Sequence, residues 1–435
     1  MDFDSVSTPK RTIDTTTGAE TVYMKIGGLP VIIAKKPGFR SKHAVFGTHF
    51  GSVDRSFSYR GKPTLVPRGT AHFLEHKMFA KPFGDSFELF SDVGANANAY
   101  TGYNHTGYVF TCAEKFGEAL DILLETVTTP YFTDENVKKE MGIIKQEIDM
   151  LHDSPSNRCY YNLLECLFEN HPIKEEIAGT ESSISKITPD ILYLCHEAFY
   201  SAGNSVLCCC GDIDEDDVAK IVAKHFKKNE SSLPERYPYP EKYETVKPFF
   251  REKMSVSMPI FCLGIKDRPV TLSGKELLRH SLACEIIADV LSSRSGDFFL
   301  RLYSEGLINS TFDSDVMRDR EFGVFSFSGE SDRPEKVIEE IKTELEHLKK
   351  RGVTQKEFLR ARNNNYGYYV SSFDNCENLA SEHLYAYFDG LTPFDTLDCY
   401  NELDLDFINS RLEYFDISKL AYSIIDKEDR DDKHC

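Results

Sequence analysis

The sequence predicts an α+β fold made of two homologous domains, each a mainly antiparallel sheet packed with helices. Three observations predict this class. A polar, proline-containing segment lies near the middle of the chain, amphipathic helices recur in the same order on both sides of it, and strand patterns lie between these helices. The length of 435 residues suits more than one structural unit.

The best candidate for a linker is the segment from Lys227 to Lys247. This segment is polar, contains three prolines and has no helical periodicity. We therefore expect an N-terminal domain over residues 1–228, a linker over residues 229–247 and a C-terminal domain over residues 248–435.

Each half contains a helix, a break and a second helix that begins at a threonine. In the first half, apolar residues at helical spacing occupy residues 113–128, and the second helix is expected from Thr133, which two acidic residues follow. In the second half, the corresponding helices are expected over residues 334–350 and from Thr354. The recurrence predicts a degenerate internal repeat.

Strand patterns lie between the helices. Residues 44–50 alternate loosely, residues 98–111 predict two strands around a turn near Asn104, and residues 205–210 predict a buried strand. The last strand contains three consecutive cysteines. Because free cysteine behaves as a small apolar side chain, we expect core residues here rather than disulfides or a metal site.

Composition restricts the class of protein. The formal net charge of −19 argues against nucleic acid or an anionic membrane as a main partner. No apolar run approaches the roughly 18 residues of a membrane span. The first residues resemble neither a secretory signal nor a transit peptide. The twelve cysteines include no C-x-x-C pair, and free core cysteines such as those of residues 208–210 favour a reducing compartment. We expect a cytoplasmic protein.

The run His-Phe-Leu-Glu-His, from His72 to His76, carries the chemistry that the sequence suggests. If Thr70 caps a helix here, the two histidines lie one turn apart and their imidazoles converge on one ion. Glu75 is then placed to reach a water held by that ion. Zinc binds imidazole and carboxylate, and H-x-x-E-H is an inverted zinc-peptidase motif. Two packed or surface histidines are the alternative that the motif alone leaves open.

A catalytic zinc site needs a third protein ligand, and the helix from Thr133 offers two carboxylates. Glu140 and Glu147 lie seven residues apart, or about two turns, at the edge of its apolar face. A carboxylate among apolar residues is unfavourable unless it is paired or binds a metal. Two solvated acids bordering the core are the alternative, and spacing alone does not choose between them.

These residues resemble the pitrilysin/insulysin family of zinc metallopeptidases, which includes the mitochondrial processing peptidases. The resemblance covers essentially the whole chain, as a short two-domain member of bacterial type. In that family the H-x-x-E-H helix is followed by a ligand glutamate, with a further glutamate seven residues before it. The resemblance implies that His72, His76 and Glu147 bind Zn²⁺. It also implies that Glu75 is the general base and that Glu140 is a catalytic carboxylate that orients the site.

The stretch from Gly94 to Thr101 resembles the family's G-x-x-x-N-A-x-T pattern, where an edge strand pairs with the substrate backbone. The resemblance implies substrate contacts in this strand and at the end of the zinc helix. A turn followed by an ordinary strand is the alternative. The candidates for substrate contact are Phe79, Ala97, Asn98 and Ala99.

The second half departs from the pattern of a zinc domain. It has no H-x-x-E-H run, so we do not expect it to bind zinc. Active family members resemble one another in an arginine and a tyrosine seven residues apart on the half without zinc. Here Arg301 is present, but Ile308 stands in the place of the tyrosine and cannot donate a hydrogen bond to an oxyanion. We expect Arg301 to make a surface or interface contact.

The missing tyrosine implies a partner. We expect a clamshell dimer in which a zinc-free paralogous subunit supplies the missing pair. A second copy of this chain is the alternative partner. The predicted function is a zinc-dependent endopeptidase that hydrolyses peptides or unfolded segments inside an enclosed chamber. The alternative is a non-catalytic or peptide-binding subunit of a peptidase-like heterodimer, and the intact set of His72, Glu75, His76 and Glu147 favours catalysis.

Overall fold

The structure is a computed structural model that describes residues 9–15, 17–227, 232–268 and 272–428. The chain forms two compact units. One boundary between them, at Pro238 and Tyr239, falls within the predicted linker, of which residues 229–231 lie outside the described part. The first unit comprises Met1–Ile148, Glu176–Pro238 and Val370–Phe394, and the second comprises Asp149–Glu175, Tyr239–Tyr369 and Asp395–Cys435.

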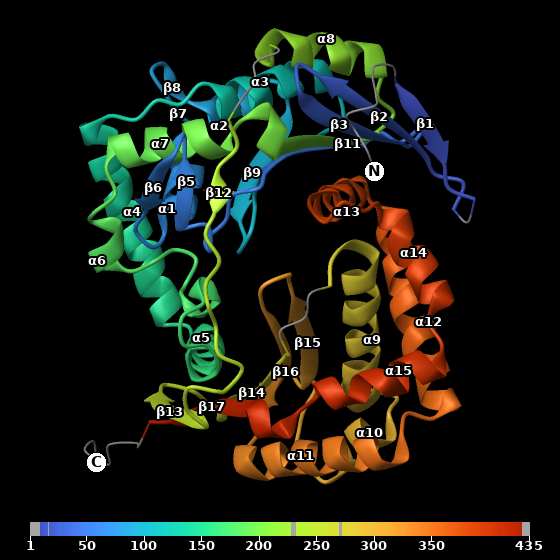
Figure 1. The fold of residues 1–435 in the computed structure, drawn as a ribbon. Helices are drawn as coiled ribbons and strands as arrows, with labels where there is room; N and C mark the ends of the chain where they lie inside the picture. Colours follow the sequence, from blue (N-terminus) through green and yellow to red (C-terminus); the bar gives the residue numbers. More distant parts are fainter. Residues whose placement is uncertain (1–8, 16, 228–231, 269–271, 429–435) are drawn as a thin grey trace. The chain divides into compact units, whose positions relative to one another are not determined.

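The first unit is built around a large sheet, in which seven strands are described, in the order β1-β2-β3-β11-β4-β10-β9 (Figure 1). Strand β11 pairs with β3 in parallel, and the other pairs are antiparallel. Strand β9 therefore forms one edge of the sheet. The bounds are β1 Lys10–Ile13, β2 Glu20–Ile26, β3 Leu29–Lys35, β4 Lys42–Thr48, β9 Ala95–Thr101, β10 Thr106–Cys112 and β11 Ser205–Gly211.

Helices cover both faces of this sheet (Figure 1). Helices α3 and α8 pack together on one face, and α13 packs against β11 and β4 on the other. Short strands complete the unit: β5 (Ser56–Tyr59) pairs with β6 (Lys62–Leu65) and β12 (Glu235–Arg236), and β7 (Ala80–Lys81) pairs with β8 (Gly84–Asp85). The helices are α1 Thr70–Met78, α2 Ser86–Asp92, α3 Phe116–Thr128, α4 Asp134–His152, α6 Glu181–Ile184, α7 Pro189–Phe199, α8 Glu215–His225 and α13 Cys376–Phe388.

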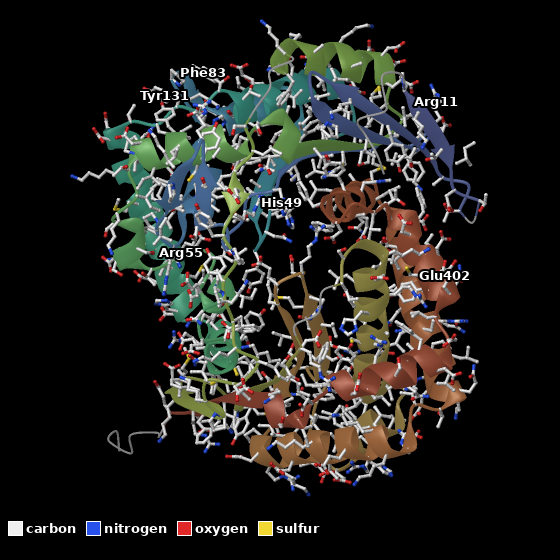
Figure 2. The ribbon with its side chains drawn as sticks, viewed as in Figure 1. Arg11, His49, Arg55, Phe83, Tyr131 and Glu402 are labelled. Atoms are coloured by element: carbon white, nitrogen blue, oxygen red, sulfur yellow. The ribbon has the colours of Figure 1, made fainter. Side chains whose placement is uncertain are left out.

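Phe46 and Gly47, neighbouring residues of β4, face opposite sides of the sheet. Phe46 stacks on Phe226, just after α8, with ring centroids 6.0 Å apart. Gly47 points the other way, and a Cβ atom built on it would lie 2.1 Å from Leu384 Cδ1 of α13. Only glycine at this position lets α13 approach the sheet so closely. His49 lies just after β4 (Figure 2). Its ring stacks on that of Phe388 in α13, with centroids 4.9 Å apart.

The second unit contains a sheet, in which five strands are described, in the order β13-β17-β14-β16-β15. Helix α5, from the N-terminal half of the chain, packs on β17 and β14. The strands are β13 Phe249–Met254, β14 Ile260–Lys266, β15 Asp313–Arg318, β16 Gly323–Glu330 and β17 Leu420–Lys427. The helices are α5 Pro155–Leu167, α9 Gly274–Ser292, α10 Asp297–Ser304, α11 Pro334–Arg351, α12 Gln355–Ser372, α14 Pro393–Glu402 and α15 Leu405–Arg411.

The two sheets repeat one another, which confirms the predicted internal repeat. The series β3-β11-β4-β10-β9 of the first matches β13-β17-β14-β16-β15 of the second. In each series the first pair is parallel and the following pairs are antiparallel. Gly264 of β14 faces Leu163 and Leu167 of α5, as Gly47 of β4 faces Leu384 of α13. The α+β class predicted from the sequence is confirmed.

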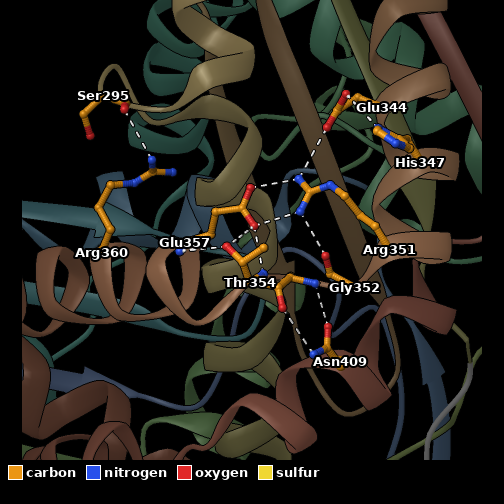
Figure 3. A network of polar contacts seen from close by, with 10 residues as sticks. Ser295, Glu344, His347, Arg351, Gly352, Thr354, Glu357, Arg360 and Asn409 are labelled. Atoms are coloured by element: carbon orange, nitrogen blue, oxygen red, sulfur yellow. Dashed lines mark hydrogen bonds and ion pairs between the residues drawn. The ribbon is translucent and has the colours of Figure 1, made fainter.

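Thr133 and Thr354 cap the N-termini of α4 and α12, as the sequence predicts. At the start of α4, Thr133 Oγ1 accepts a hydrogen bond from the Asn136 amide at 3.2 Å, and Asn136 Oδ1 accepts one from the Thr133 amide at 3.0 Å. At the start of α12, Thr354 and Glu357 exchange the same kind of hydrogen bonds, and Arg351 donates two more to the Glu357 carboxylate (Figure 3). These contacts close the turn between α11 and α12.

The cysteines follow the sequence expectation. Cys208, Cys209 and Cys210 are buried in β11, and all eleven cysteines of the described residues are buried and unbridged. Among the described helices, none is long and apolar enough to span a membrane.

A buried ion pair anchors the second unit. The Glu241 carboxylate accepts hydrogen bonds from the backbone amides of Glu169, Asn170 and His171 at 2.7–3.0 Å and from Lys266 Nζ at 2.6 Å. Lys266 is 4% exposed, and its ammonium also donates to the carbonyl oxygen of Leu167 at 2.9 Å. Burial opposes the charge on Glu241, but these donors outweigh it and lower the pKa of its carboxyl to about 2.

Glu241→Gln should lower the free energy of unfolding at pH 7 by about 2 kcal/mol, because it leaves the buried Lys266 ammonium without its counterion. The pKa of Glu241 is lowered by folding, so its stabilisation is present above about pH 4.5 and is lost as the pH falls toward 2. Urea unfolding of both proteins from pH 7 to pH 3 should show the difference shrinking. Glu346→Gln, on an exposed position of α11, is the control and should change little. A constant difference at every pH would contradict this account.

Candidate metal centre

Helix α1 carries the H-x-x-E-H run, and all of its residues except His76 are buried. The prediction that Thr70 caps this helix is wrong. The cap is Gly69, with a φ of 82°, and a Cβ atom on it would lie 2.4 Å from the Ala178 carbonyl oxygen. This left-handed conformation and close approach require glycine. Thr70 is the first helical residue, and its hydroxyl donates to the Pro67 carbonyl at 2.7 Å.

The two histidines of α1 face one carboxylate of α4. The rings of His72 and His76 lie edge to face, with centroids 4.6 Å apart. The Nε2 atom of His72 is 3.4 Å from Glu147 Oε1, and the Nε2 atom of His76 is 3.5 Å from Glu147 Oε2. One ligand atom from each of the three residues lies within 4.8 Å of the others. The structure thus brings together the three residues that the resemblance implied as zinc ligands.

Glu140 of α4 contacts the other ring nitrogen of His76. Its Oε1 atom is 3.1 Å from His76 Nδ1, and its Oε2 atom accepts a hydrogen bond from Lys77 Nζ at 3.1 Å. Burial opposes the charge of Glu140, but the hydrogen bond to His76 and the charge of Lys77 keep the pKa of its carboxyl below the usual range. The Nδ1 atom of His72, by contrast, is buried without a hydrogen-bond partner among the described residues.

The remaining predicted residue of the run, Glu75, is 8% exposed. Its Oε2 atom accepts a hydrogen bond of 2.7 Å from the hydroxyl of Thr101, the last residue of β9. The sequence interpretation missed Thr101, although it closes the N-A-x-T pattern. It also missed Lys77, whose only sequence signal is its position directly after His76.

The predicted substrate-contact residues lie beside this helix. Strand β9, which contains Ala97, Asn98 and Ala99, contacts both α1 and α2. Asn98 is exposed, and its Oδ1 atom accepts a hydrogen bond from the Ala99 amide at 2.9 Å. Phe79 is buried at the end of α1 and stacks at 4.1 Å on Phe87, which is 40% exposed. Of these two rings, Phe87 presents more surface.

The donor set fits zinc. Within the described residues, His72, His76 and Glu147 form the group of imidazole, thiol and carboxylate side chains whose ligand atoms converge in this way. Two imidazoles and one carboxylate are a donor set of catalytic zinc sites, which keep a further position for water. A carboxylate on the second nitrogen of a ligating histidine, as Glu140 is on His76, is the usual support of such a ligand.

The second unit has no equivalent group among its described residues. Helix α9 contacts β15 and β16 as α1 contacts β9 and β10, but it carries no H-x-x-E-H run. A pocket of about 340 Å³ lies between α9, β15 and α12, and its lining includes four carboxylates and no histidine. These carboxylates belong to Glu285, Asp289, Asp313 and Asp315.

Arg301, the arginine that the sequence analysis singled out, forms ion pairs on the surface of the second unit. Arg301 Nη1 lies 2.9 Å from Glu340 Oε2 and 3.7 Å from Glu305 Oε1, and all three side chains are partly exposed. Ile308 is 5% exposed within the hydrophobic core of this unit. Arg301 therefore makes the surface contact that the sequence predicted.

Comparisons with known proteins point to one family. The family model described as insulinase (peptidase family M16) matches residues 66–181, and the model described as peptidase M16 inactive domain matches residues 186–365. A Bacillus subtilis protein named as the uncharacterized zinc protease YmfH is 34% identical over 402 residues, covering 91% of this chain and 94% of that protein. An uncharacterized zinc protease of Rickettsia felis is 27% identical over 68% of this chain and 71% of that protein.

Solved structures show the same fold. The crystal structure of a putative M16-like peptidase from Alicyclobacillus acidocaldarius has a TM-score of 0.91 and 31% identity, covering 94% of this chain and 99% of that one. A protease from Helicobacter pylori, at 19% identity, has a TM-score of 0.79 and covers 96% of this chain and 100% of that one. The resemblance drawn from the H-x-x-E-H run is confirmed: the chain belongs to the insulinase family, peptidase family M16.

Proposed function

We propose that this chain is a zinc-dependent endopeptidase that hydrolyses peptides or unfolded segments. The observation that carries the proposal is the convergence of His72, His76 and Glu147 in a donor set that suits catalytic zinc. Zinc bound there supplies a Lewis acid and lowers the pKa of a bound water. The relatives named as zinc proteases support the same activity.

The residues around the ligands have separate tasks. Glu75, one residue before His76, is the general base that takes the proton of the attacking water. The Thr101 hydroxyl holds Glu75 Oε2, which fixes the direction of the carboxylate and leaves Oε1 as the proton acceptor. Glu140 accepts a hydrogen bond from His76 Nδ1, so the lone pair of His76 Nε2 points toward Glu147.

We place the substrate along the open edge of β9. An extended peptide added to this edge uses main-chain hydrogen bonds, which give affinity without reading the side chains. The half-buried Ala97 and Ala99 leave room for a close approach of the peptide, and the exposed Asn98 side chain offers a polar contact. The Phe79–Phe87 pair supplies an apolar contact beside α1.

The site also needs a group that stabilises the oxyanion. Because Arg301 is paired on the surface and Ile308 is in the core, we propose that a zinc-free paralogous subunit supplies this group. The unbridged cysteines of the described residues support a cytoplasmic location for this complex. The lack of an oxyanion-stabilising pair at Arg301 and Ile308 also favours the second candidate function, a peptide-binding subunit without turnover of its own.

Glu75→Gln should retain zinc but lower the cleavage rate of an unstructured fluorogenic peptide by about 10²–10⁴-fold, because the substituted side chain cannot accept the proton of the water. Bound metal and initial rates should be measured on the same samples. Glu118→Gln, an exposed glutamate of α3, is the matched control and should retain full activity. Normal cleavage by Glu75→Gln, or wild-type protein without zinc, would sink the proposal.

Glu147→Gln and Glu140→Gln should separate the two carboxylates of α4. Glu147→Gln removes a proposed ligand and should abolish stoichiometric zinc at micromolar metal. Glu140→Gln removes a supporting hydrogen-bond partner and should weaken zinc binding by about 10–100-fold. Zinc content after dialysis and competition with a chromophoric chelator measure the two effects. If Glu147→Gln retains zinc as wild type does, the proposed ligand set is wrong.

The partner proposal predicts that activity depends on a second subunit. The purified chain alone should cleave the peptide poorly, and adding the zinc-free paralogue of its own genome should raise the rate and produce a heterodimer in analytical ultracentrifugation. The Glu75→Gln chain with the same paralogue should form the dimer without the activity. Full activity in a strict monomer would rule out a required partner.

A further inference from the structure

Lys77 is a buried cation next to the proposed metal ligands. It follows His76 in α1, its side chain is 4% exposed, and its Nζ atom donates a hydrogen bond of 3.1 Å to Glu140 Oε2. A buried ammonium is unfavourable unless it has a charged partner. Lys77 therefore depends on Glu140, and Glu140 is held in place by Lys77.

Glu140 is consequently held at both oxygens. Oε1 faces His76 Nδ1 and Oε2 faces Lys77 Nζ, each at 3.1 Å. These two contacts fix the rotation of the carboxylate group about its own axis. With Glu140 fixed, His76 is fixed as the tautomer that carries its proton on Nδ1 and presents Nε2 toward Glu147.

The Lys77–Glu140 contact also makes the two glutamates of α4 differ in their ability to bind a metal. Glu140 and Glu147 are both carboxylates of α4, and either one suits zinc as a ligand. An ammonium on Glu140 Oε2 occupies one lone pair and repels a divalent cation. Among the described residues, no ammonium or guanidinium contacts Glu147. Its carboxylate faces the imidazoles of His72 and His76 instead.

We propose that Lys77 is a positioning residue that holds Glu140 as the hydrogen-bond partner of His76 and keeps it out of the ligand set, which leaves Glu147 as the carboxylate ligand. This inference rests on the proposed zinc site. It predicts that Lys77 acts on zinc affinity through Glu140 and not through the stability of the helix alone.

The chain offers a matched control in Lys81. This lysine is also buried, at 5% exposed, but its Nζ atom donates to the carbonyl oxygens of Thr126 and Thr129 at 2.8 and 2.5 Å. These contacts satisfy the C-terminal end of α3, where a cation is favourable. Lys81→Met thus removes a buried lysine of the same kind without touching Glu140.

The experiment is a double-mutant cycle on the full-length chain. Zinc dissociation constants are measured by competition with a chromophoric chelator for wild type, Lys77→Met, Glu140→Gln and the double variant. Lys77→Met should weaken zinc binding by about tenfold, and in the Glu140→Gln background it should add less than about twofold. Lys77→Arg should restore most of the affinity. The absorption spectrum of the Co²⁺-loaded protein should change in Lys77→Met, because the metal then meets a different carboxylate arrangement.

Lys81→Met should lower the melting temperature and leave the zinc dissociation constant unchanged. The inference is overturned if Lys77→Met behaves in the same way, or if its effect on affinity multiplies fully with that of Glu140→Gln. If Lys77→Met does not fold, Lys77→Gln, which keeps a donor without the charge, carries the same cycle. Wild-type protein that binds no zinc overturns the proposed function and this inference together. Wild type that binds zinc while Lys77→Met keeps its affinity overturns the inference alone.

Discussion

The site depends on the rotation of helix α4, which turns two carboxylates toward the histidines of α1. Val137, Ile144 and Ile148 are the buried residues of α4 and fix which side of the helix faces inward. Glu140 and Glu147 lie three residues after Val137 and Ile144, so packing of the apolar stripe draws both acids into the half-buried zone. The imidazoles of His72 and His76 and the buried ammonium of Lys77 offset the cost of burying two carboxylates there.

Much of the fold was predictable because its signals are local. The apolar spacing of α3 and α4, the helical patterns of α11 and α12 and the caps at Thr133 and Thr354 are read from neighbouring residues, and the structure confirms these helices and caps. The cap of α1 was not predictable in this way. The close approach of the Ala178 carbonyl, more than a hundred residues away, requires glycine at position 69, and this contact overrides the preference for Thr70.

In the site, too, the features set by local spacing were predictable and those set by tertiary packing were not. Helical spacing placed His72, Glu75 and His76 on one turn, but spacing could not say which carboxylate of α4 faces which imidazole nitrogen. That choice depends on how α4 packs, and only the family resemblance supplied it beforehand. Thr101 and Lys77 stayed hidden for the same reason, since each acts on a residue brought near by tertiary structure. The acidic pocket of the second unit shows that a repeated scaffold fixes positions while side chains decide the chemistry.

Helices α5 and α13 are exchanged between the two halves of the chain. Each belongs to one half of the sequence and covers the sheet formed mainly by the other half, against a matching glycine. This exchange is the arrangement that a domain-swapped dimer of a single ancestral repeat would leave once its two copies were fused into one gene. A fragment cut at the middle of the chain would retain a sheet without its covering helix, and exposed apolar strands are prone to aggregate. Each half of the chain therefore needs the other to complete its own layer of helices.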